Sequence, residues 1–337
     1  MNKNKFTSRL NLIILIILSF IVIVFALKDN FNEIINEILT INLWWFFVGL
    51  ILMFGYCLFR AMVLHNLILK FDPQYKLSRA FGVNLLAQFF NGITPFGSGQ
   101  PFVIYTLKRE GIRGTDSMNI VIQDFILHQI ALIILGTIAI LLNWMLNIFP
   151  KVIFLKEIVL IGYIVNVAVV VLLFGMAFSK KMNQKITNIT IRFLSKFKII
   201  KNQDHIIDKW EDRINRFHDG TAILLEDKEE FIKNVILNIL SLLSAYIIPV
   251  AILYSLGDYH SFNAVIAIIA SAYIMLVGSV IPTPGSTGAL EYAFIAFFAN
   301  FIGGGLLSAT MLLWRFLTYY LFLIIGAITF NIWKKRA

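Results

Sequence analysis

Long, almost uninterrupted apolar runs divide this chain. At 1.5 Å per helical residue, about twenty apolar residues are needed to cross the roughly 30 Å hydrocarbon core of a bilayer. Runs that approach or exceed this length cover residues 10–27, 43–69, 117–142, 158–178, 231–256 and 306–332. With 59% hydrophobic and only 14% charged residues, the 337-residue chain is too apolar for a soluble fold. The sequence predicts an all-α polytopic membrane protein, one transmembrane domain over residues 1–337 with about six full spanning helices.

The basic residues of the chain indicate how it crosses the membrane. Its net charge of +10 comes from Lys and Arg in the loops and at both ends, which is typical of topology signals rather than of nucleic-acid binding. Lys3, Lys5 and Arg9 precede the first run, and no small-residue cleavage site follows it, so we expect an uncleaved helix rather than a signal peptide. With residues 334–336 reading KKR, both termini are predicted to be cytoplasmic in a multi-pass protein of the cell membrane.

One apolar stretch, residues 80–108, is interrupted in its middle by "NGITPFGSGQP" (91–101), which has two prolines and three glycines. Basic residues stand at both ends of the stretch: Lys76 and Arg79 before it, and Lys108 and Arg109 where it ends. Both ends are therefore predicted to lie on the cytoplasmic side. A segment that enters and returns on one side is a re-entrant hairpin, and its irregular backbone survives at membrane depth only when protein or a wet cavity surrounds it.

A second interruption, "PTPGSTG", lies between the apolar runs 262–281 and 289–301. A cytoplasmic C-terminus requires that residues 262–302 start and finish outside, which predicts a second re-entrant hairpin entering from the outer side. The two breaks resemble each other, since TPFGSG (94–99) stands against TPGSTG (283–288). Two similar units of opposite orientation form an inverted repeat, which with its broken helices is typical of transporters.

The segment 180–230 is predicted to be a basic cytoplasmic loop. Its first part carries seven Lys and Arg residues and no acid up to residue 201, which places it next to anionic lipid headgroups. Apolar residues then recur at helical spacing between 206 and 217. This pattern is typical of an amphipathic helix on the membrane surface or against the domain, and equally of a solvated helical linker.

Ionisable side chains within the apolar runs are the first candidates for a substrate site. Arg60 lies in the second run, Asp124 in the third beside Gln123 and His128, Glu291 directly after the second break, and Arg315 in the last run. Charges at membrane depth are costly and usually face a partner or a cavity. The hypothesis is that both arginines attract a lipid phosphate and that the two acids pair with them when the cavity is empty. Alternatively, each pair only fixes packing.

Polar side chains and glycines around the breaks are further candidates. Asn84, Gln88 and Asn91 are spaced to share one helix face, where they bind a headgroup or cap neighbouring half-helices. Glycine lets backbone approach a ligand closely, and half-helix N-termini near 101 and 289 offer N–H groups that suit a phosphate. The complete predicted substrate site comprises Arg60, Asn84, Gln88, Asn91, Thr94, Pro95, Gly97, Ser98, Gly99, Gln100, Asp124, Pro282, Pro284, Gly285, Gly288, Glu291, Arg315 and Tyr319.

Signatures of catalysis are missing from the sequence. The five histidines show no metal-ligand spacing, and no glycine-rich phosphate loop follows a strand. We therefore expect no enzyme activity, metal or cofactor, and transport that is passive or ion-coupled.

Three segments, "NGITPFGSGQPFVIYTLKREGI", "IPTPGSTGALEYAF" and "LLWRFLTYYLFLIIG", carry a family resemblance. With them the chain resembles, over essentially residues 10–332, the transmembrane flippase domain of the lysylphosphatidylglycerol synthase (multiple peptide resistance factor) family, which also occurs as stand-alone membrane proteins. The resemblance points to a substrate role for Asn91, Thr94, Pro95, Gly99, Pro282, Pro284, Gly285, Gly288, Glu291, Arg315 and Tyr319. The family often has an acid at Gln100 and an Arg near Asp124, which leaves the headgroup open.

Three functions remain in competition. The resemblance implies a flippase for anionic phospholipid or glycolipid headgroups, with membrane lipids as partners. The same inverted architecture serves a carrier for polyprenyl phosphate or a small solute. The third function is a membrane subunit of a lipid-modifying, phosphatidylglycerol lysyltransferase-like system, with a lipid synthase or a second copy of the chain as partner. The family's soluble aminoacyl-transferase domain is not found in the sequence, so we expect no lysyltransferase activity.

Overall fold

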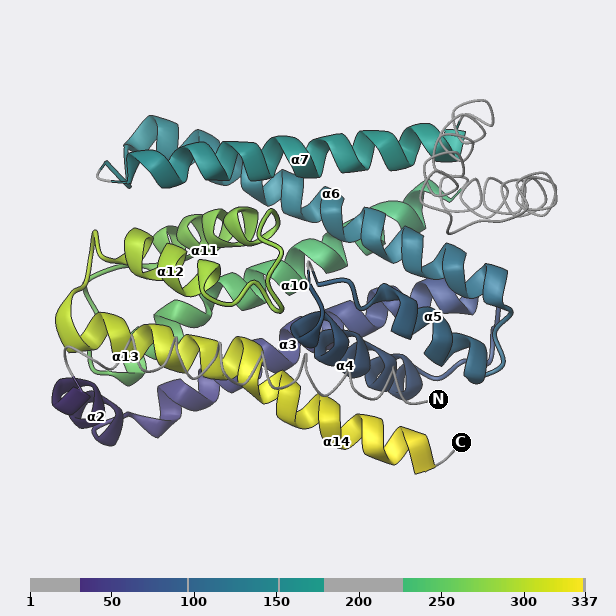
Figure 1. Ribbon diagram of the computed structural model, residues 1–337, viewed down its shortest axis with the longest axis horizontal. Coiled ribbons are helices and arrows are strands. Elements are labelled where there is room, and N and C mark those ends of the chain that lie inside the picture. The colour runs from purple at the N-terminus through teal and green to yellow at the C-terminus, as the bar shows by residue number, and fades with distance from the viewer. Residues whose placement is uncertain (1–30, 96, 151, 179–226, 336–337) are drawn as a thin grey trace, which may run out of the picture.

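The computed structural model describes residues 31–95, 97–150, 152–178 and 227–335, and every extended regular element in them is a helix (Figure 1). The helices are α2 (Phe31–Leu39), α3 (Leu43–Leu69), α4 (Leu77–Ile93), α5 (Gln100–Arg109), α6 (Gly114–Leu146), α7 (Ile153–Phe178), α10 (Lys228–Ser255), α11 (Ala264–Gly278), α12 (Ala289–Phe298), α13 (Gly304–Arg315), η1 (Phe316–Tyr320) and α14 (Leu321–Lys335). The predicted first span, 10–27, and the amphipathic segment, 206–217, lie outside the described residues.

Five helical stretches are long and apolar enough to cross a membrane. They are Leu43–Leu69, Gly114–Leu146, Phe154–Gly175, Lys228–Ser255 and Gly304–Trp333, and they match five of the six predicted runs. The last stretch joins α13, the π-helical turn η1 and α14 into one continuous helix. The described part of the chain therefore has the helices of a multi-pass membrane protein.

Helix α2 was missed by the sequence prediction, which expects no helix between the runs 10–27 and 43–69. Ile34 is completely buried, and the apolar residues Ile34, Ile35 and Ile38 recur at helical spacing, a signal that was available. Glu33 has a structural role, because its Oε2 accepts a hydrogen bond from the backbone N–H of Gly305 at 3.2 Å. The carboxylate thus satisfies a free N–H at the start of α13.

Helices α4 and α5 form the first hairpin. The chain just before α4 contacts the chain just after α5, where the Tyr75 hydroxyl donates to the Glu110 carboxylate. Burial of the ring, together with this bond to an anionic partner, raises the pKa of Tyr75 above its ordinary value. The two ends of the hairpin therefore lie together at one end of the bundle.

Helices α11 and α12 form a second hairpin of the same kind. Phe262, which precedes α11, packs against Phe298 at the end of α12 with ring centroids 4.8 Å apart. Burial is nearly complete here, since Phe298 is 0% exposed and Phe262 only 2%. Burial of aromatic surface therefore holds the two ends of the second hairpin together. In the first hairpin, the hydrogen bond between Tyr75 and Glu110 joins the two ends.

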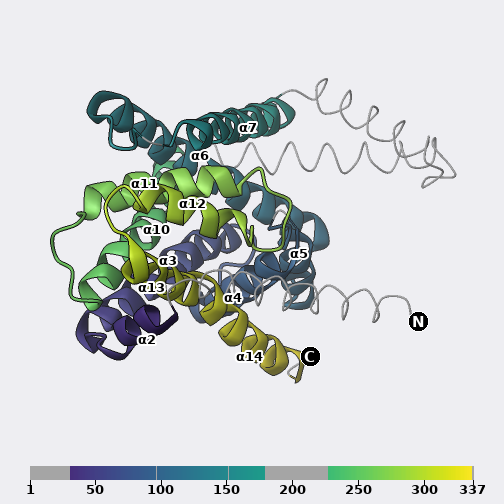
Figure 2. The same cartoon turned by 60° about the vertical axis from the view of Figure 1, so that its left-hand side comes forward.

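The two hairpins lie at opposite ends of the helix bundle (Figures 1 and 2). Their packing is reciprocal: α4 packs against α14, and α11 against α6, while α3 and α10 pack along each other between them. The two breaks also touch, through an isolated antiparallel bridge between Pro95 and Pro284. This is the arrangement expected of two inverted repeats whose broken helices meet in the middle.

Two hydrophobic cores hold the hairpins in place. The larger one surrounds α11 and α12 and contains the fully buried Phe149, Phe294 and Phe297. The smaller one surrounds α4 and α5 and contains Leu107 and Ile120, both 0% exposed. Each hairpin is thus anchored in its own core, and the breaks project toward each other between the two.

Membrane orientation of the first hairpin is tested by cysteine labelling in a Cys57→Ser background. Ser78 and Arg113 are exposed at the hairpin's two ends, and Tyr259 is 45% exposed near the opposite end of the bundle. Because basic loops stay in the cytoplasm, we expect cysteines at 78 and 113 to react only from inside and one at 259 only from outside. Labelling of positions 78 and 113 from opposite sides would contradict the hairpin and the inverted repeat.

Candidate functional site

The first break is stabilised by its own polar side chains. The Thr94 hydroxyl donates to the Phe90 carbonyl at 2.6 Å, and the Ser98 hydroxyl donates to the Pro95 carbonyl at 2.7 Å. Asn91 Oδ1 accepts from the backbone N–H of Gly99 at 2.9 Å, directly before α5. These bonds satisfy backbone groups that the interrupted helices leave free.

Gly99 is a position where the break tolerates no side chain. A Cβ there would lie 2.6 Å from Asn91 Oδ1 and 2.8 Å from the Asn91 backbone nitrogen. We expect Gly99→Ala to lower the free energy of unfolding by about 1–3 kcal/mol through overpacking and displacement of the break. The matched control is Gly82→Ala in α4, where a Cβ meets nothing within 4 Å. Thermal unfolding measures both variants, and equal stability of the two would contradict the prediction.

The second break depends on residues in the left-handed backbone region. Gly285, Ser286 and Gly288 have φ values of 57°, 51° and 88°. Glycine adopts such values without a Cβ clash, and Ser286 is held by a bond from its hydroxyl to the Gly278 carbonyl at 2.9 Å. The carboxylate Oε2 of Glu291 accepts from the Gly288 N–H at 2.7 Å, which caps α12.

Arg315 clamps this second break from the last membrane helix. Its Nε donates to Glu291 Oε1 at 2.6 Å, and one terminal nitrogen donates to the Gly285 carbonyl at 3.0 Å. The guanidinium also lies 4.4 Å from the centre of the Tyr319 ring. Both charged side chains are 4% exposed. Because a carboxylate, a carbonyl and an aromatic face surround the cation, this pair has the surroundings that a buried ion pair needs to be stable.

Tyr319 links the last helix to the first break. It lies in η1, the π-helical turn, and its hydroxyl donates to the Gly92 carbonyl of α4 at 3.1 Å. A Cβ on Gly285 would collide with the Tyr319 ring, so glycine is also required there for space. One aromatic side chain therefore contacts both hairpins next to the bridge between Pro95 and Pro284. Single π-helical turns occur frequently at functional sites.

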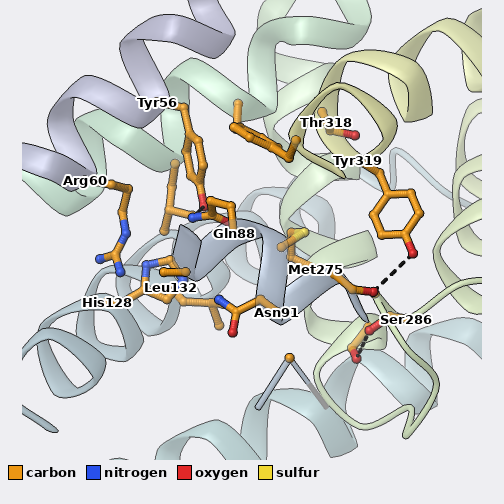
Figure 3. Close-up of a pocket in the computed structure, with 18 of the residues that line it drawn as sticks. Tyr56, Arg60, Gln88, Asn91, His128, Leu132, Met275, Ser286, Thr318 and Tyr319 are labelled. Carbon is orange, nitrogen blue, oxygen red and sulfur yellow. Dashed lines mark hydrogen bonds between the residues drawn. The ribbon is translucent and has the colours of Figure 1, made fainter. Parts of the chain in front are cut away.

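A cavity of about 360 Å³ lies between the two breaks, walled by all the described helices except α2. Figure 3 shows Arg60 and His128 at one end of this pocket and Tyr319 and Ser286 at the other. Ten of the predicted site residues line it: Arg60, Asn84, Gln88, Asn91, Gly97, Gln100, Asp124, Gly285, Arg315 and Tyr319. The cavity is thus large enough for a polar headgroup and not for a whole lipid.

The remaining predicted residues do not line the cavity and build the breaks instead. They are Thr94, Pro95, Ser98, Gly99, Pro282, Pro284, Gly288 and Glu291. Ser98 and Pro282 are exposed, and Glu291 is buried as the cap of α12. These residues lie beside the cavity in this structure. Their contact with a substrate stays a prediction from the sequence.

Arg60 and Asp124 form an ion pair in the cavity wall. Arg60 on α3 approaches Asp124 Oδ2 on α6 to 2.7 Å, and another guanidinium nitrogen donates to Asn238 Oδ1 on α10 at 2.6 Å. Their side chains are 12% and 20% exposed, against 4% for Glu291 and Arg315. The structure therefore shows both ion pairs of the sequence hypothesis. The pair of Arg60 with Asp124 is the more exposed of the two.

Around this pair, four buried polar atoms have no hydrogen-bond partner among the described residues. They are Arg60 Nε, Asp124 Oδ1, His128 Nδ1 and Gln129 Oε1, and all four residues line the cavity. Leaving a buried polar atom without a partner costs about 1–3 kcal/mol. Water or a ligand is therefore needed to complete this end of the cavity, whereas the Arg315 end is already complete.

Sequence reasoning missed several polar residues of the wall. Tyr56, whose hydroxyl accepts from Gln88 at 3.0 Å, stands four residues before Arg60 and so shares its helix face. His128, which the sequence analysis named beside Asp124 but did not include in the predicted site, follows Asp124 at the same spacing. Gln129 is next to it and was not named. Tyr246 and Ser271 carry no such signal, because their place in the wall depends on how α10 and α11 pack.

Within the described ranges, no group of three or more His, Cys, Asp and Glu side chains is arranged to hold a metal ion. The fold and the cavity together define a multi-pass membrane protein with a polar site between two broken helical hairpins. The chain belongs to the family described as Lysylphosphatidylglycerol synthase TM region, which it matches over residues 11–326.

A similar curated protein is a UPF0104 membrane protein from Archaeoglobus fulgidus. It is 33% identical over 119 residues, which make up 35% of this chain and 36% of that protein. The chain thus matches about a third of that relative's length. The family match confirms the resemblance that the three sequence segments indicated.

Proposed function

We propose that this protein is a lipid flippase, which moves an anionic phospholipid or glycolipid headgroup across the cytoplasmic membrane while the acyl chains stay in the bilayer. The observation that carries the proposal is the cavity between the two breaks, with the incompletely bonded guanidinium of Arg60 in its wall. A guanidinium with a free N–H is a strong partner for a phosphate oxygen. Membership of a family named for lipid synthesis at a membrane supports a lipid substrate.

The two hairpins give the proposed route its shape. Helices α4–α5 and α11–α12 enter the bundle from opposite ends, and their breaks meet at the cavity. In the proposed topology one hairpin is re-entrant from the cytoplasm and the other from outside. A headgroup bound between them would then be released to either side by small movements of one hairpin against the other.

A carrier for polyprenyl phosphate is the second candidate, because Arg60 offers the same chemistry to a phosphate monoester. We further propose that the protein transports lipid without modifying it, alone or beside a separate lipid synthase or a second copy.

Reconstitution in liposomes tests the proposal. Fluorescent lipids that share their chains and differ only in headgroup (phosphatidylglycerol, phosphatidylethanolamine, phosphatidylcholine, a glycolipid and a polyprenyl phosphate) are scored for exchange between leaflets by a membrane-impermeant quencher. We expect faster exchange of an anionic phospholipid or glycolipid than in protein-free liposomes, with the lipid chemically unchanged on chromatography. Acceleration of polyprenyl phosphate alone would favour the second candidate, and no acceleration of any lipid would contradict both.

A further inference from the structure

A line of polar residues, here called the polar track, leads from the cavity along the interface of α3 and α10. Its members are Arg60, Asn66, Lys70, Glu230, Asn234 and Asn238. Asn238 accepts from Arg60 and donates to the Asn234 carbonyl at 3.0 Å. Asn66 donates to Asn234 Oδ1 at 2.9 Å, and Lys70 pairs with Glu230 at 2.9 Å. The track ends at the face of the bundle that the charge pattern predicts to be cytoplasmic.

The asparagines of the track are unusual choices for a packed helix interface. Asn234 and Asn238 are both 0% exposed, and Asn234 Nδ2 has no hydrogen-bond partner among the described residues. Leucine has a similar size and would pack here without the cost of burying an amide. Buried water typically satisfies such unpaired groups, and a proton passes along a chain of hydrogen-bonded water molecules that the amides hold in place.

At the cavity end of the track, charge balance limits what can bind. Arg60 and Asp124 together are neutral. A phosphate anion at the free Nε of Arg60 would place two anions beside one cation in a poorly screened environment, which is strongly unfavourable. Neutralising the carboxylate removes this conflict, and it leaves the Arg60 cation to the phosphate.

We propose that an anionic headgroup binds at Arg60 together with one proton, which the neighbouring Asp124 takes up and which reaches it from the cytoplasmic face along the polar track. This inference rests on the proposed flippase function and adds its coupling to protons. A hydronium ion in the track gives the proton to the Asp124 carboxylate and remains as water. When the headgroup leaves, the proton returns to water and the pair of Arg60 with Asp124 forms again, so no bond of the lipid changes.

The other titratable groups that line the cavity in the described part of the chain do not compete for this proton. His128 on α6 is buried beside the Arg60 cation, which disfavours a second positive charge there. From α3 and α10, Tyr56 and Tyr246 face the pair as phenols, which stay neutral near neutral pH. Arg315 and Tyr319 face the cavity from the last helix, and the Arg315 charge is balanced by Glu291. The polar wall residues of α4 and α5, among them Asn84 and Gln100, do not titrate.

Binding of dihexanoylphosphatidylglycerol to the detergent-solubilised protein tests the inference. Calorimetry between pH 6 and 8 gives the dissociation constant, and a soluble pH indicator in weak buffer counts protons. We expect about one proton taken up per lipid bound, and a dissociation constant that rises up to about tenfold per pH unit, because one proton is linked to binding. Any binding retained by Asp124→Asn, which mimics the protonated carboxyl, is expected to be independent of pH.

The track itself is tested by the rate of proton uptake in stopped-flow mixing. We expect Asn234→Leu to slow uptake at least about tenfold while the dissociation constant stays that of wild type, since Asn234 does not line the cavity. Thr310→Val, which removes another fully buried polar group away from the track, serves as the control and is expected to change neither. An unchanged uptake rate in Asn234→Leu overturns the role of the track.

The two proposals fail in different ways. Binding of the lipid without proton uptake and without pH dependence overturns this inference and leaves the flippase proposal standing. Absence of binding by any phosphate-bearing lipid, together with no flipping in liposomes, contradicts the flippase function itself.

Discussion

Replacing Arg60 with glutamine is expected to reduce lipid flipping by about a hundredfold or more. The change removes the phosphate partner and leaves Asp124, its partner at 2.7 Å, as an unpaired charge in the cavity wall. Breaking a buried pair from one side typically costs about 3–5 kcal/mol, and about 3 kcal/mol corresponds to a hundredfold change in binding. Flipping in liposomes and thermal unfolding in detergent measure the two effects separately.

Two controls separate loss of binding from loss of fold. Arg79→Gln removes a positive charge from an exposed position at the start of α4 and is expected to leave flipping unchanged. The double change Arg60→Gln with Asp124→Asn removes both charges, so stability is expected to recover while flipping stays low. Normal flipping by a folded Arg60→Gln protein would contradict the role of Arg60 as the headgroup anchor.

The second large effect concerns Glu291 and Arg315. Each single change to glutamine is expected to lower the free energy of unfolding by about 3–5 kcal/mol, because it leaves one charge buried without its partner at 2.6 Å. We expect the double change to regain much of this stability and of the flipping, since the pair clamps the second break and its contacts are internal.

The same double variant tests the sequence hypothesis that Arg315 also attracts the phosphate. If melting temperature recovers in the double variant while flipping stays absent in Arg315→Gln and in the double variant alike, then Arg315 binds the headgroup and is more than a clamp. Flipping that returns together with stability would rule out a phosphate-binding role.

Local features of the sequence predicted most of the helices. The run 117–142 corresponds to α6, which extends a few residues further at both ends, and the breaks at TPFGSG and TPGSTG separate α4 from α5 and α11 from α12. Proline and glycine mark such ends locally, so no tertiary information is needed. Helix α2 was missed because its nine residues are too few for a membrane span and include the acids Glu33 and Glu37.

Candidate residues were found more readily than their partners. A charge within an apolar run singles out Arg60 and Asp124, but 64 positions separate them and no periodicity relates α3 to α6. The same holds for Asn234, because its place in the polar track depends on its hydrogen bond with Asn66 of another helix, which the sequence does not reveal. Which polar residues line the cavity and which only build the breaks also depends on the packing of α4 against α14 and of α11 against α6.

A threonine-to-cysteine pair tests most directly whether lipid passes through the cavity. Thr318 lines the cavity and Thr329 does not, although both donate to the carbonyl four residues earlier, at 2.7 and 2.8 Å. Each is replaced by cysteine in the Cys57→Ser background, and flipping is measured before and after attachment of a bulky thiol reagent, with labelling verified by mass. We expect both unlabelled proteins to flip lipid and labelling to abolish flipping only at position 318. Undiminished flipping with position 318 fully labelled would contradict a headgroup path through this cavity.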